Sequence, residues 1–207
     1  MKLEPASYKA VQYACRYFHY AKAVPQALCS FSVFNDAGEW CGCIVYSLGA
    51  NQYLGRKFGL VQGEVCELVR VALNGRHGST SKAVAISLKL LKKVNPLLKL
   101  VVSYADCDQE HTGTIYQATN WIYAGLVELN GGTPKFRIKG KVTHARSLGS
   151  RGWKANIDWI RKYKDATAEL VYTKGKHKYL FPLTKAVEDR CRPHSKPYPK
   201  KTNAAVA

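Results

Sequence analysis

The feature that most restricts the fold is the junction between an apolar run and a polar segment at residues 97–111. Residues 97–102 are mostly apolar and predict a buried strand. Acids, hydroxyls and an imidazole follow at once, and the sequence becomes helix-like at residues 112–124. In an α/β fold, polar groups at the carboxyl end of a strand gather at a ligand crevice. The alternative is a plain strand-to-helix loop capped by Thr112, because Ser, Thr and Asp are ordinary capping residues.

Helical and strand-like patterns alternate along the rest of the chain. Hydrophobic periodicity predicts helices at residues 7–21, 82–94 and 153–164, a β-hairpin around the turn sequence DAGE, and a strand at residues 65–74. We expect Glu67 and Arg70 to lie on opposite faces of that strand. The order of elements resembles the mixed α/β fold of GNAT-type N-acyltransferases. In that fold two central strands splay apart to admit an acyl donor, and here they would be residues 67–73 and 98–106.

Positive charge is concentrated in the C-terminal part of the chain. Residues 1–134 carry 13 Lys/Arg and 9 Asp/Glu, a net charge of +4, whereas residues 135–207 carry 19 and 5, a net charge of +14. Such an asymmetry predicts a polyanionic partner, with Lys and Arg on phosphates and aromatic side chains on unpaired bases. At least half of the aromatic residues in this part are expected to form local core instead. We therefore predict a core at residues 1–134, a basic segment at 135–190 that completes the sheet and contacts DNA, and a disordered tail at 191–207.

The composition also bounds the class of protein. The sequence has no run of ~20 apolar residues and no apolar signal segment, so neither a membrane span nor a secretory leader is expected. Its seven cysteines are scattered without zinc-ligand spacing, which favours small buried thiols in a reducing compartment. The cytoplasm is the expected location.

Several residues are candidates for chemistry. The loop NGRHGSTS before a helix is a candidate phosphate cradle, although Gly and Ser there often serve only as a cap. Arg70 in an apolar run would pair with a carboxylate or bound anion, or face solvent. Tyr116 could transfer a proton or simply pack in the core. His19, His111 and Asp106 have the composition of a two-histidine, one-carboxylate iron site, although their spacing carries no metal signature.

Four segments carry a resemblance to a known family. The motifs HYAKAVP (19–25), ELVRVALNGRHGSTS (67–81), SYADCDQEHTGTIYQATNWIYAG (103–125) and GKVTHARSLGSRG (140–152) resemble those of the Mom proteins of Mu-like bacteriophages. The resemblance spans roughly residues 8–185. Mom proteins are a divergent GNAT-like group that converts adenine in phage DNA to N6-carbamoylmethyl-adenine and so protects the genome from host restriction enzymes.

The resemblance implies a set of site residues. Tyr20, Arg70, Ser81, Asp106 and Tyr116 would line the donor and reaction pocket, with His19 adjacent. From the residues themselves we add Ser103 to the catalytic candidates Arg70, Asp106 and Tyr116, and Arg76, Gly78 and Ser79 to the cofactor-binding candidates Tyr20 and Ser81. The resemblance also implies that the segment ARSLGSRG, with Arg146, Ser147 and Arg151, approaches DNA, and we add the neighbouring Lys141 and Trp153. The expected donor is acetyl-CoA or another activated two-carbon compound, and the substrate is double-stranded DNA with a flipped adenine or single-stranded DNA. The oligomeric state is open, a homodimer included.

Two departures from ordinary GNAT enzymes bear on the mechanism. Their general-acid tyrosine stands four residues before a glycine, but this chain has Trp121 before Gly125. The pyrophosphate loop is also imperfect, since RHGSTS has Ser81 at its last small position. An unusual donor is therefore expected. Our hypothesis is that Asp106, or a water that it holds, takes the amine proton, Arg70 and Ser81 position the donor, and Tyr116 assists the leaving group.

Two other function classes remain open from the sequence. One is a non-catalytic nucleic-acid-binding protein built on an acyltransferase scaffold, and the other is a GNAT acetyltransferase that acts on a protein or small molecule. A new adenine nucleoside in DNA from cells that express the chain would support only the DNA-modifying enzyme.

Overall fold

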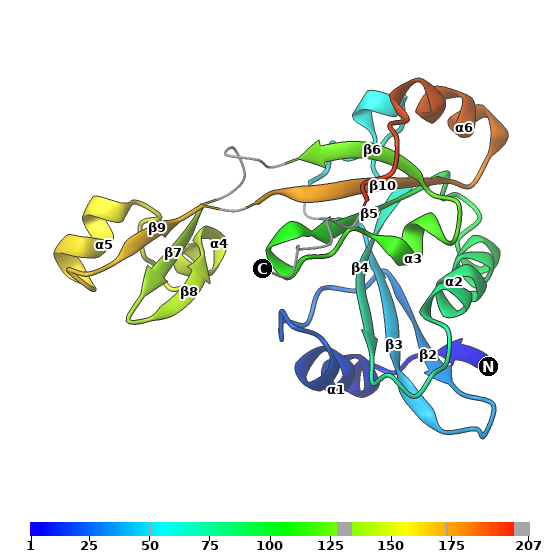
Figure 1. Ribbon diagram of the computed structural model, residues 1–207, viewed down its shortest axis with the longest axis horizontal. Coiled ribbons are helices and arrows are strands. Elements are labelled where there is room, and N and C mark those ends of the chain that lie inside the picture. Colours follow the sequence, from blue (N-terminus) through cyan, green and yellow to red (C-terminus); the bar gives the residue numbers. More distant parts are fainter. Residues whose placement is uncertain (50, 128–133, 173, 201–207) are drawn as a thin grey trace, which may run out of the picture. The chain divides into compact units, whose positions relative to one another are not determined.

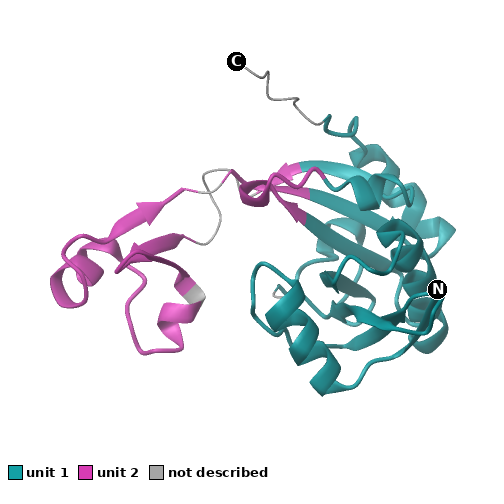
Figure 2. Cartoon of the chain, turned by 60° about the horizontal axis from the view of Figure 1, so that its bottom comes forward, with its two compact units in different colours: residues 1–104, 113–125, 178–207 teal, residues 105–112, 126–177 magenta. Residues whose placement is uncertain are grey.

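The computed structural model describes residues 1–49, 51–127, 134–172 and 174–200 (Figure 1). The chain divides into two compact units (Figure 2). The larger unit comprises residues 1–104, 113–125 and 178–207, and the smaller unit comprises residues 105–112 and 126–177. The predicted basic segment 135–190 is thus divided, because its residues 178–190 belong to the larger unit.

The secondary structure follows the mixed α/β order that the sequence predicted. The strands are β1 (Lys2–Pro5), β2 (Cys29–Phe34), β3 (Trp40–Ser47), β4 (Val65–Leu73), β5 (Leu100–Asp106), β6 (Ile122–Val127), β7 (Lys135–Ile138), β8 (Lys141–His144), β9 (Glu169–Val171) and β10 (Lys176–Pro182). The α-helices are α1 (Tyr8–Phe18), α2 (Thr80–Val94), α3 (Thr114–Gln117), α4 (Ala145–Gly149), α5 (Ile157–Tyr163) and α6 (Lys185–Cys191), and the short 3-10 helices are η1 (Arg56–Phe58), η2 (Cys107–Gln109) and η3 (Arg192–His194).

Seven strands form the main sheet in the order β1-β2-β3-β4-β5-β10-β6. The pairs from β1 to β4 are antiparallel, and β4 and β5 are parallel. Helix α1 packs on one face, where Val11, Ala14 and Cys15 meet the apolar side chains of β3 and β4. Helix α2 covers the other face, where its Ser87 hydroxyl lies 2.7 Å from that of Tyr46 in β3. The predicted helix at 7–21 and the predicted hairpin are thus confirmed.

A β-bulge in β4 overturns one prediction about side-chain direction. Val45 of β3 lies opposite Arg70, but the next residue, Tyr46, lies opposite Leu68, so Val69 is an extra residue. The extra residue shifts the alternation of side chains by one position. Ser47 lies opposite Glu67. Because Val45 and Ser47 share a face of β3, Glu67 and Arg70 also share a face, and the prediction of opposite faces was wrong.

The predicted helix at 112–124 is shortened to Thr114–Gln117, and its last three residues belong to a strand. Helix α3 ends at Gln117, and β6 begins at Ile122. The backbone of Asn120 has a φ of 59°, in the left-handed region, which ends the helical turn. The following Ile-Tyr pair favours a strand, and β6 takes the edge of the sheet beside β10. Pairing with a distant strand therefore overrides a local helical pattern.

The smaller unit has its own sheet and core. Strands β8, β7 and β9 form a three-stranded sheet in that order. Its core contains Phe136, Ile138, Leu148 and Ile160 from the strands and from α4 and α5. Residues 135–152, the first part of the predicted basic segment, thus form two strands and a helix.

The C-terminal residues 191–200 do not form the disordered tail that the sequence predicted. Helix α6 includes Cys191, and η3 follows it. The Lys196 N–H then donates to the Tyr123 carbonyl at 2.8 Å, and the Tyr198 hydroxyl donates to the Trp121 carbonyl at 2.7 Å. These bonds hold the segment along β6. Residues 201–207 lie outside the described part of the chain.

None of the helices in the described residues is both long enough and apolar enough to cross a lipid bilayer.

Candidate functional site

The two central strands stop pairing at a defined point. Strands β4 and β5 pair in parallel from Val65 and Leu100 to Leu68 and Ser103. Beyond this point β4 continues to Leu73 along β3, and β5 continues to Asp106. The pairing of these strands ends where the bulge at Val69 begins. The structure therefore has, in β4 and β5, the parting strands that the sequence predicted.

Arg70 connects the HYAKAVP motif to the point where β4 and β5 stop pairing. Its Nε donates to the Ala23 carbonyl at 3.3 Å, and its guanidinium also donates to the Val69 carbonyl at 2.7 Å. Ala23 belongs to the HYAKAVP segment, which contains His19 and Tyr20. The half-buried Arg70 thus ties the segment after α1 to the bulge in β4. From the sequence we expected Arg70 to pair with a carboxylate or a bound anion, or to face solvent. The structure shows hydrogen bonds from Arg70 to backbone carbonyls.

Ser103 and Tyr116 form a buried hydrogen-bonded pair where the strands part. The Ser103 hydroxyl lies 2.8 Å from the Leu68 carbonyl and 2.8 Å from the Tyr116 hydroxyl. The Leu68 carbonyl can only accept, so Ser103 donates to it, and the same Ser103 hydroxyl is hydrogen-bonded to the Tyr116 hydroxyl. This pairing joins two predicted catalytic residues where the strands part.

The environment of Tyr116 keeps its phenol protonated. The pKa of Tyr116 is raised to about 12, chiefly by burial; the hydrogen bond with Ser103 acts in the opposite direction, and the charge of Glu67 adds to the rise. The Tyr116 ring also packs against Trp121 and Tyr179, each with its ring centroid 5.0 Å away. A phenol in this state is suited to donate a proton and not to accept one. Glu67 is a site residue that the sequence left undecided, and its position in an apolar strand run was the only signal.

Gly113 fixes the start of the short helix that carries Tyr116. Its φ is +78°, and a Cβ at this position would lie 2.3 Å from the Tyr179 ring. We expect Gly113→Ala to lower the free energy of unfolding by roughly 2–5 kcal/mol, since it combines left-handed strain with overpacking. Gly38→Ala is the matched control, because Gly38 has a φ of +79° with nothing within 4 Å. Urea unfolding of both variants measures the difference, and equal losses would contradict the packing argument.

The predicted phosphate loop precedes a well-capped helix. Ser79 is the N-cap of α2, and its hydroxyl accepts from the Lys82 N–H at 3.2 Å and lies 3.1 Å from the Ser81 hydroxyl. Arg76 is exposed, and nothing lies within 4 Å of a Cβ built on Gly78. The first N–H groups of a helix have no partner within the helix. The loop therefore presents an exposed cation and accessible backbone at the start of a 15-residue helix.

His77 is a buried polar residue that the sequence did not single out. Its Nε2 lies 2.7 Å from the Thr80 hydroxyl, whereas its buried Nδ1 makes no hydrogen bond within the described residues. Burial lowers the pKa of His77. The folded imidazole therefore stays neutral at pH values where an unfolded one is already protonated. Its position inside the RHGSTS loop was the available signal.

His77 predicts a pH dependence of stability. Because the folded pKa lies below the unfolded one, the unfolded chain binds more protons as pH falls through the usual histidine range near 6.5. Stability is thus fully present above that range and is lost below it. We expect His77→Gln to reduce the dependence of unfolding free energy on pH between pH 6.5 and 5 by up to about one proton. Thr80→Val, which keeps the imidazole, should retain the dependence, and an unchanged slope in His77→Gln would contradict the assignment.

Two neighbouring carboxylates at the end of β5 differ in their contacts. The Asp106 carboxylate accepts from the Asp108 N–H at 3.0 Å and so caps η2. Asp108 accepts from the Lys174 N–H at 2.9 Å and from the Lys135 ammonium at 3.0 Å. Burial raises the pKa of Asp108, but these two hydrogen bonds and the charges of Lys135 and Lys174 together more than offset it, so the net pKa is lowered. Asp108 therefore holds together segments of the smaller unit.

The pleat of β5 separates Asp106 from Ser103. Side chains alternate along a strand, so residues three positions apart point to opposite faces. Ser103 lies on the face of Leu68. The sequence grouped Asp106 with Ser103 and Tyr116 as catalytic residues. The pleat of β5 does not bring the Asp106 and Ser103 side chains to one face, and the role of Asp106 remains a prediction.

The two histidines of the predicted iron site have other surroundings. His19 accepts from the Ala21 N–H at 3.1 Å through Nδ1, and its ring stacks on Tyr20 with the centroids 4.4 Å apart. The exposed His111 follows η2, and its backbone N–H donates to the Asp106 carbonyl. In the described residues, no group of three or more His, Cys, Asp or Glu side chains is placed to hold a metal ion. The structure thus provides no support for the iron site.

The predicted DNA-binding residues lie in the smaller unit. Lys141, Ser147 and Arg151 are exposed, and the side chain of Arg146 lies outside the described part of the chain. Trp153 packs against the core of this unit, and the Lys164 ammonium lies 4.8 Å from its ring centroid. Trp153 therefore contributes to the small core, as expected for some of the C-terminal aromatics. DNA contact by these residues remains a prediction.

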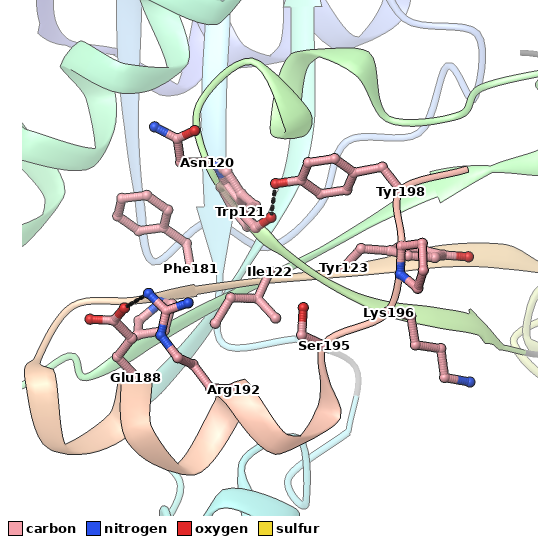
Figure 3. A pocket seen from close by; sticks show the side chains of 12 residues that line it. Asn120, Trp121, Ile122, Tyr123, Phe181, Glu188, Arg192, Ser195, Lys196 and Tyr198 are labelled. Atoms are coloured by element: carbon pink, nitrogen blue, oxygen red, sulfur yellow. Dashed lines mark hydrogen bonds and ion pairs between the residues drawn. The ribbon is translucent and has the colours of Figure 1, made fainter. Parts of the chain in front are cut away.

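A separate pocket of about 560 Å³ lies between β6, β10, α6 and the C-terminal segment (Figure 3). Arg192 and Glu188 form an ion pair at its wall, and Lys196 and Tyr198 line the opposite side. Trp121 belongs to this wall but is itself fully buried. The pocket contains none of the predicted site residues, so it is distinct from the parting of β4 and β5. Trp121 stands where ordinary GNAT enzymes have their general-acid tyrosine, and in this chain it is a buried core residue.

The structure is similar to solved acetyltransferases. A mutant of the spermidine N-acetyltransferase SpeG from Vibrio cholerae superposes with a TM-score of 0.51 at 9% identity, covering 91% of this chain and 99% of that chain. A chimera of SpeG from Vibrio cholerae and hSSAT gives 0.49 at 9% identity, covering 90% and 99%. An acetyltransferase from Bacillus subtilis in complex with CoA gives 0.44 at 12% identity, covering 88% and 99%. The superposition on SpeG at a TM-score of 0.51 confirms the fold of GNAT-type N-acyltransferases that the sequence predicted.

Sequence comparison identifies the family. No curated protein sequence matches the chain. The profile of the Mom protein family matches residues 1–200, which is nearly the whole length. The four motifs that carried the resemblance all lie within this range. The chain therefore belongs to the Mom protein family.

Proposed function

We propose that this chain is a GNAT-type transferase that attaches a carbamoylmethyl group to the N6 amine of adenine in DNA. The observation that carries the proposal is the match of the Mom protein family over residues 1–200 together with a GNAT fold whose central strands part at Ser103. The net charge of +18 is consistent with a DNA substrate, since Lys and Arg neutralise phosphates. Protection of a phage genome from host restriction, inside the host cytoplasm, is the biological role that we infer.

The donor would bind at the start of α2. An acyl-CoA or related donor carries phosphate groups, and residues 76–81 fit such anions. Arg76 is exposed there, the backbone at Gly78 is accessible, and the first N–H groups of α2 have no partner in the helix ladder. Ser79 and Ser81 add hydroxyl groups. When bound, the donor supplies an activated two-carbon group. Arg70 would keep the HYAKAVP segment, with Tyr20, in position beside β4.

The transfer requires two proton movements. The adenine amine is a weak nucleophile whose lone pair is delocalised, and inside a duplex it is also paired, so the base must be extruded or single-stranded. As the N6 lone pair forms a bond to the methylene carbon of the carbamoylmethyl group, the bond from that methylene carbon to the leaving group breaks. Asp106, or a water that it holds, takes the N6 proton, and Tyr116 gives its proton to the leaving group. The protonated state of Tyr116 and its bond to Ser103 support the second role.

Mass spectrometry of nucleosides tests the proposal. Plasmid DNA from bacterial cells that express the chain would be digested to nucleosides and compared with DNA from cells without it. We expect a 2′-deoxyadenosine derivative in which a carbamoylmethyl group replaces one N6 hydrogen. DNA with unmodified adenine, from cells in which the folded protein is abundant, would reject this function and leave the DNA-binding scaffold or an acetyltransferase with another substrate.

A further inference from the structure

Helix α1 has an unusual outward face. Its inward side chains, Val11, Ala14 and Cys15, pack on β3 and β4. At 100° per residue, the opposite direction is occupied by Lys9, Arg16, Tyr13 and Tyr17. An outward helix face usually carries charged and polar residues only. Here two aromatic rings lie beside the two cations on this face. We call these four residues the α1 face.

The tyrosines of the α1 face are strongly exposed. Tyr13 is 50% exposed and Tyr17 is 64% exposed. Their ring centroids are 4.5 Å apart, with an angle of 38° between the planes. Tyr8 and Tyr20, at the two ends of the helix, are 67% and 48% exposed. Adjacent solvent-exposed rings of this kind mark an interaction surface more often than an ordinary soluble face.

The charge around the α1 face has one sign. Residues 5–35 contain three cations, Lys9, Arg16 and Lys22, and no Asp or Glu. The described structure gives Lys9 and Arg16 no ion pair. A surface with unopposed cations beside exposed rings complements an anionic chain that also carries flat aromatic groups. Unpaired nucleotides have this chemistry, because their phosphates attract cations and every base can stack on an aromatic ring.

We propose that the α1 face binds an unpaired stretch of the DNA strand, with Tyr13 and Tyr17 stacked on bases and Lys9 and Arg16 on phosphates. The inference rests on the proposed function for its ligand, and it assigns contacts with the substrate strand to the larger unit. A second copy of this chain is the less favourable occupant. In a twofold interface the α1 face would meet itself, so that Lys9 and Arg16 would be brought close to their own copies.

Binding to labelled oligonucleotides tests the proposal on the full chain. Fluorescence anisotropy would be measured with a single-stranded DNA oligonucleotide and with its duplex. We expect Tyr17→Ala to weaken single-strand binding by about tenfold, and Tyr13→Ala with Tyr17→Ala by more, with a smaller effect on the duplex. Tyr17→Phe should bind as the unchanged protein does, since stacking needs the ring and not the hydroxyl. Tyr53→Ala, at another tyrosine that is 59% exposed, is the matched control and should have no effect.

The dependence of affinity on salt separates the cations from the rings. Each phosphate contact with a single strand contributes about 0.7 to the slope of log affinity against log salt. Replacing Lys9 and Arg16 with glutamine should therefore reduce the slope by about 1.4, whereas Tyr17→Ala should leave it unchanged. Unfolding curves of all variants verify that the fold is retained.

The results distinguish this inference from the proposed function. Adenine modification together with unaltered DNA affinity in Tyr13→Ala/Tyr17→Ala would overturn the proposed binding of DNA by the α1 face and leave the proposed function standing. Tyrosine-dependent DNA binding without adenine modification would overturn the proposed chemistry and support the α1 face. An equal loss of affinity in Tyr53→Ala, or a change of oligomeric state in place of DNA affinity in Tyr17→Ala, would overturn the inference.

Discussion

Replacing Tyr116 with phenylalanine is expected to lower the rate of adenine modification by about 10²–10⁴-fold, the usual contribution of a positioned acid or base. The substitution removes only the phenolic hydroxyl. Ser103 keeps its bond to the Leu68 carbonyl, so no buried donor loses its acceptor. The fold should therefore survive, and nucleoside mass spectrometry after a timed reaction would measure the loss.

Tyr46→Phe is the matched control for this prediction. Tyr46 is also a buried tyrosine whose hydroxyl pairs with a serine, Ser87 of α2, at 2.7 Å. Loss of that bond should cost about 1 kcal/mol of unfolding free energy and leave the modification rate unchanged. A similar loss of rate in both variants would mean that Tyr116 acts only through packing.

Replacing Asp106 with asparagine is expected to abolish modification while the fold and the affinity for DNA are kept. An asparagine oxygen can still accept from the Asp108 N–H, so η2 remains capped. The amide cannot take a proton from the adenine amine. The measurements are the yield of modified nucleoside, the unfolding curve and the affinity for an oligonucleotide.

Asp108→Asn, two residues away, provides the opposite pattern. It loses the carboxylate that pairs with the Lys135 ammonium, so the unfolding temperature should fall while modification continues at the protein's working temperature. Full activity in Asp106→Asn would reject Asp106 as the base. If Glu67→Gln were then inactive, the base would be Glu67, whose charge already acts on Tyr116.

The arrangement of Arg70 suggests why catalytic candidates cluster around an irregular strand. The bulge at Val69 turns Arg70 to the face of β4 on which α1 packs, and the guanidinium binds two backbone carbonyls there. A bulge re-aims side chains and ends regular pairing. The same irregularity therefore aims Arg70 at the HYAKAVP segment and coincides with the end of pairing between β4 and β5.

The sequence by itself determined the elements whose patterns are local. Helices α1 and α2, the hairpin of β2 and β3, and strand β5 follow from hydrophobic periodicity, turn residues and the Ser79 cap, all of which act over a few residues. The asymmetric charge and the motifs of the Mom protein family could also be recognised from the sequence alone, because they are properties of composition and residue order.

Only the tertiary structure decided the features that depend on distant partners. These are the bulge that puts Glu67 and Arg70 on one face, the strand β6 in place of a helix, the bond between Ser103 and Tyr116, and the docking of residues 195–200 along β6. Each depends on hydrogen bonds between segments far apart in the chain. Such bonds contribute only when the whole sheet has formed, so no local pattern of residues records them.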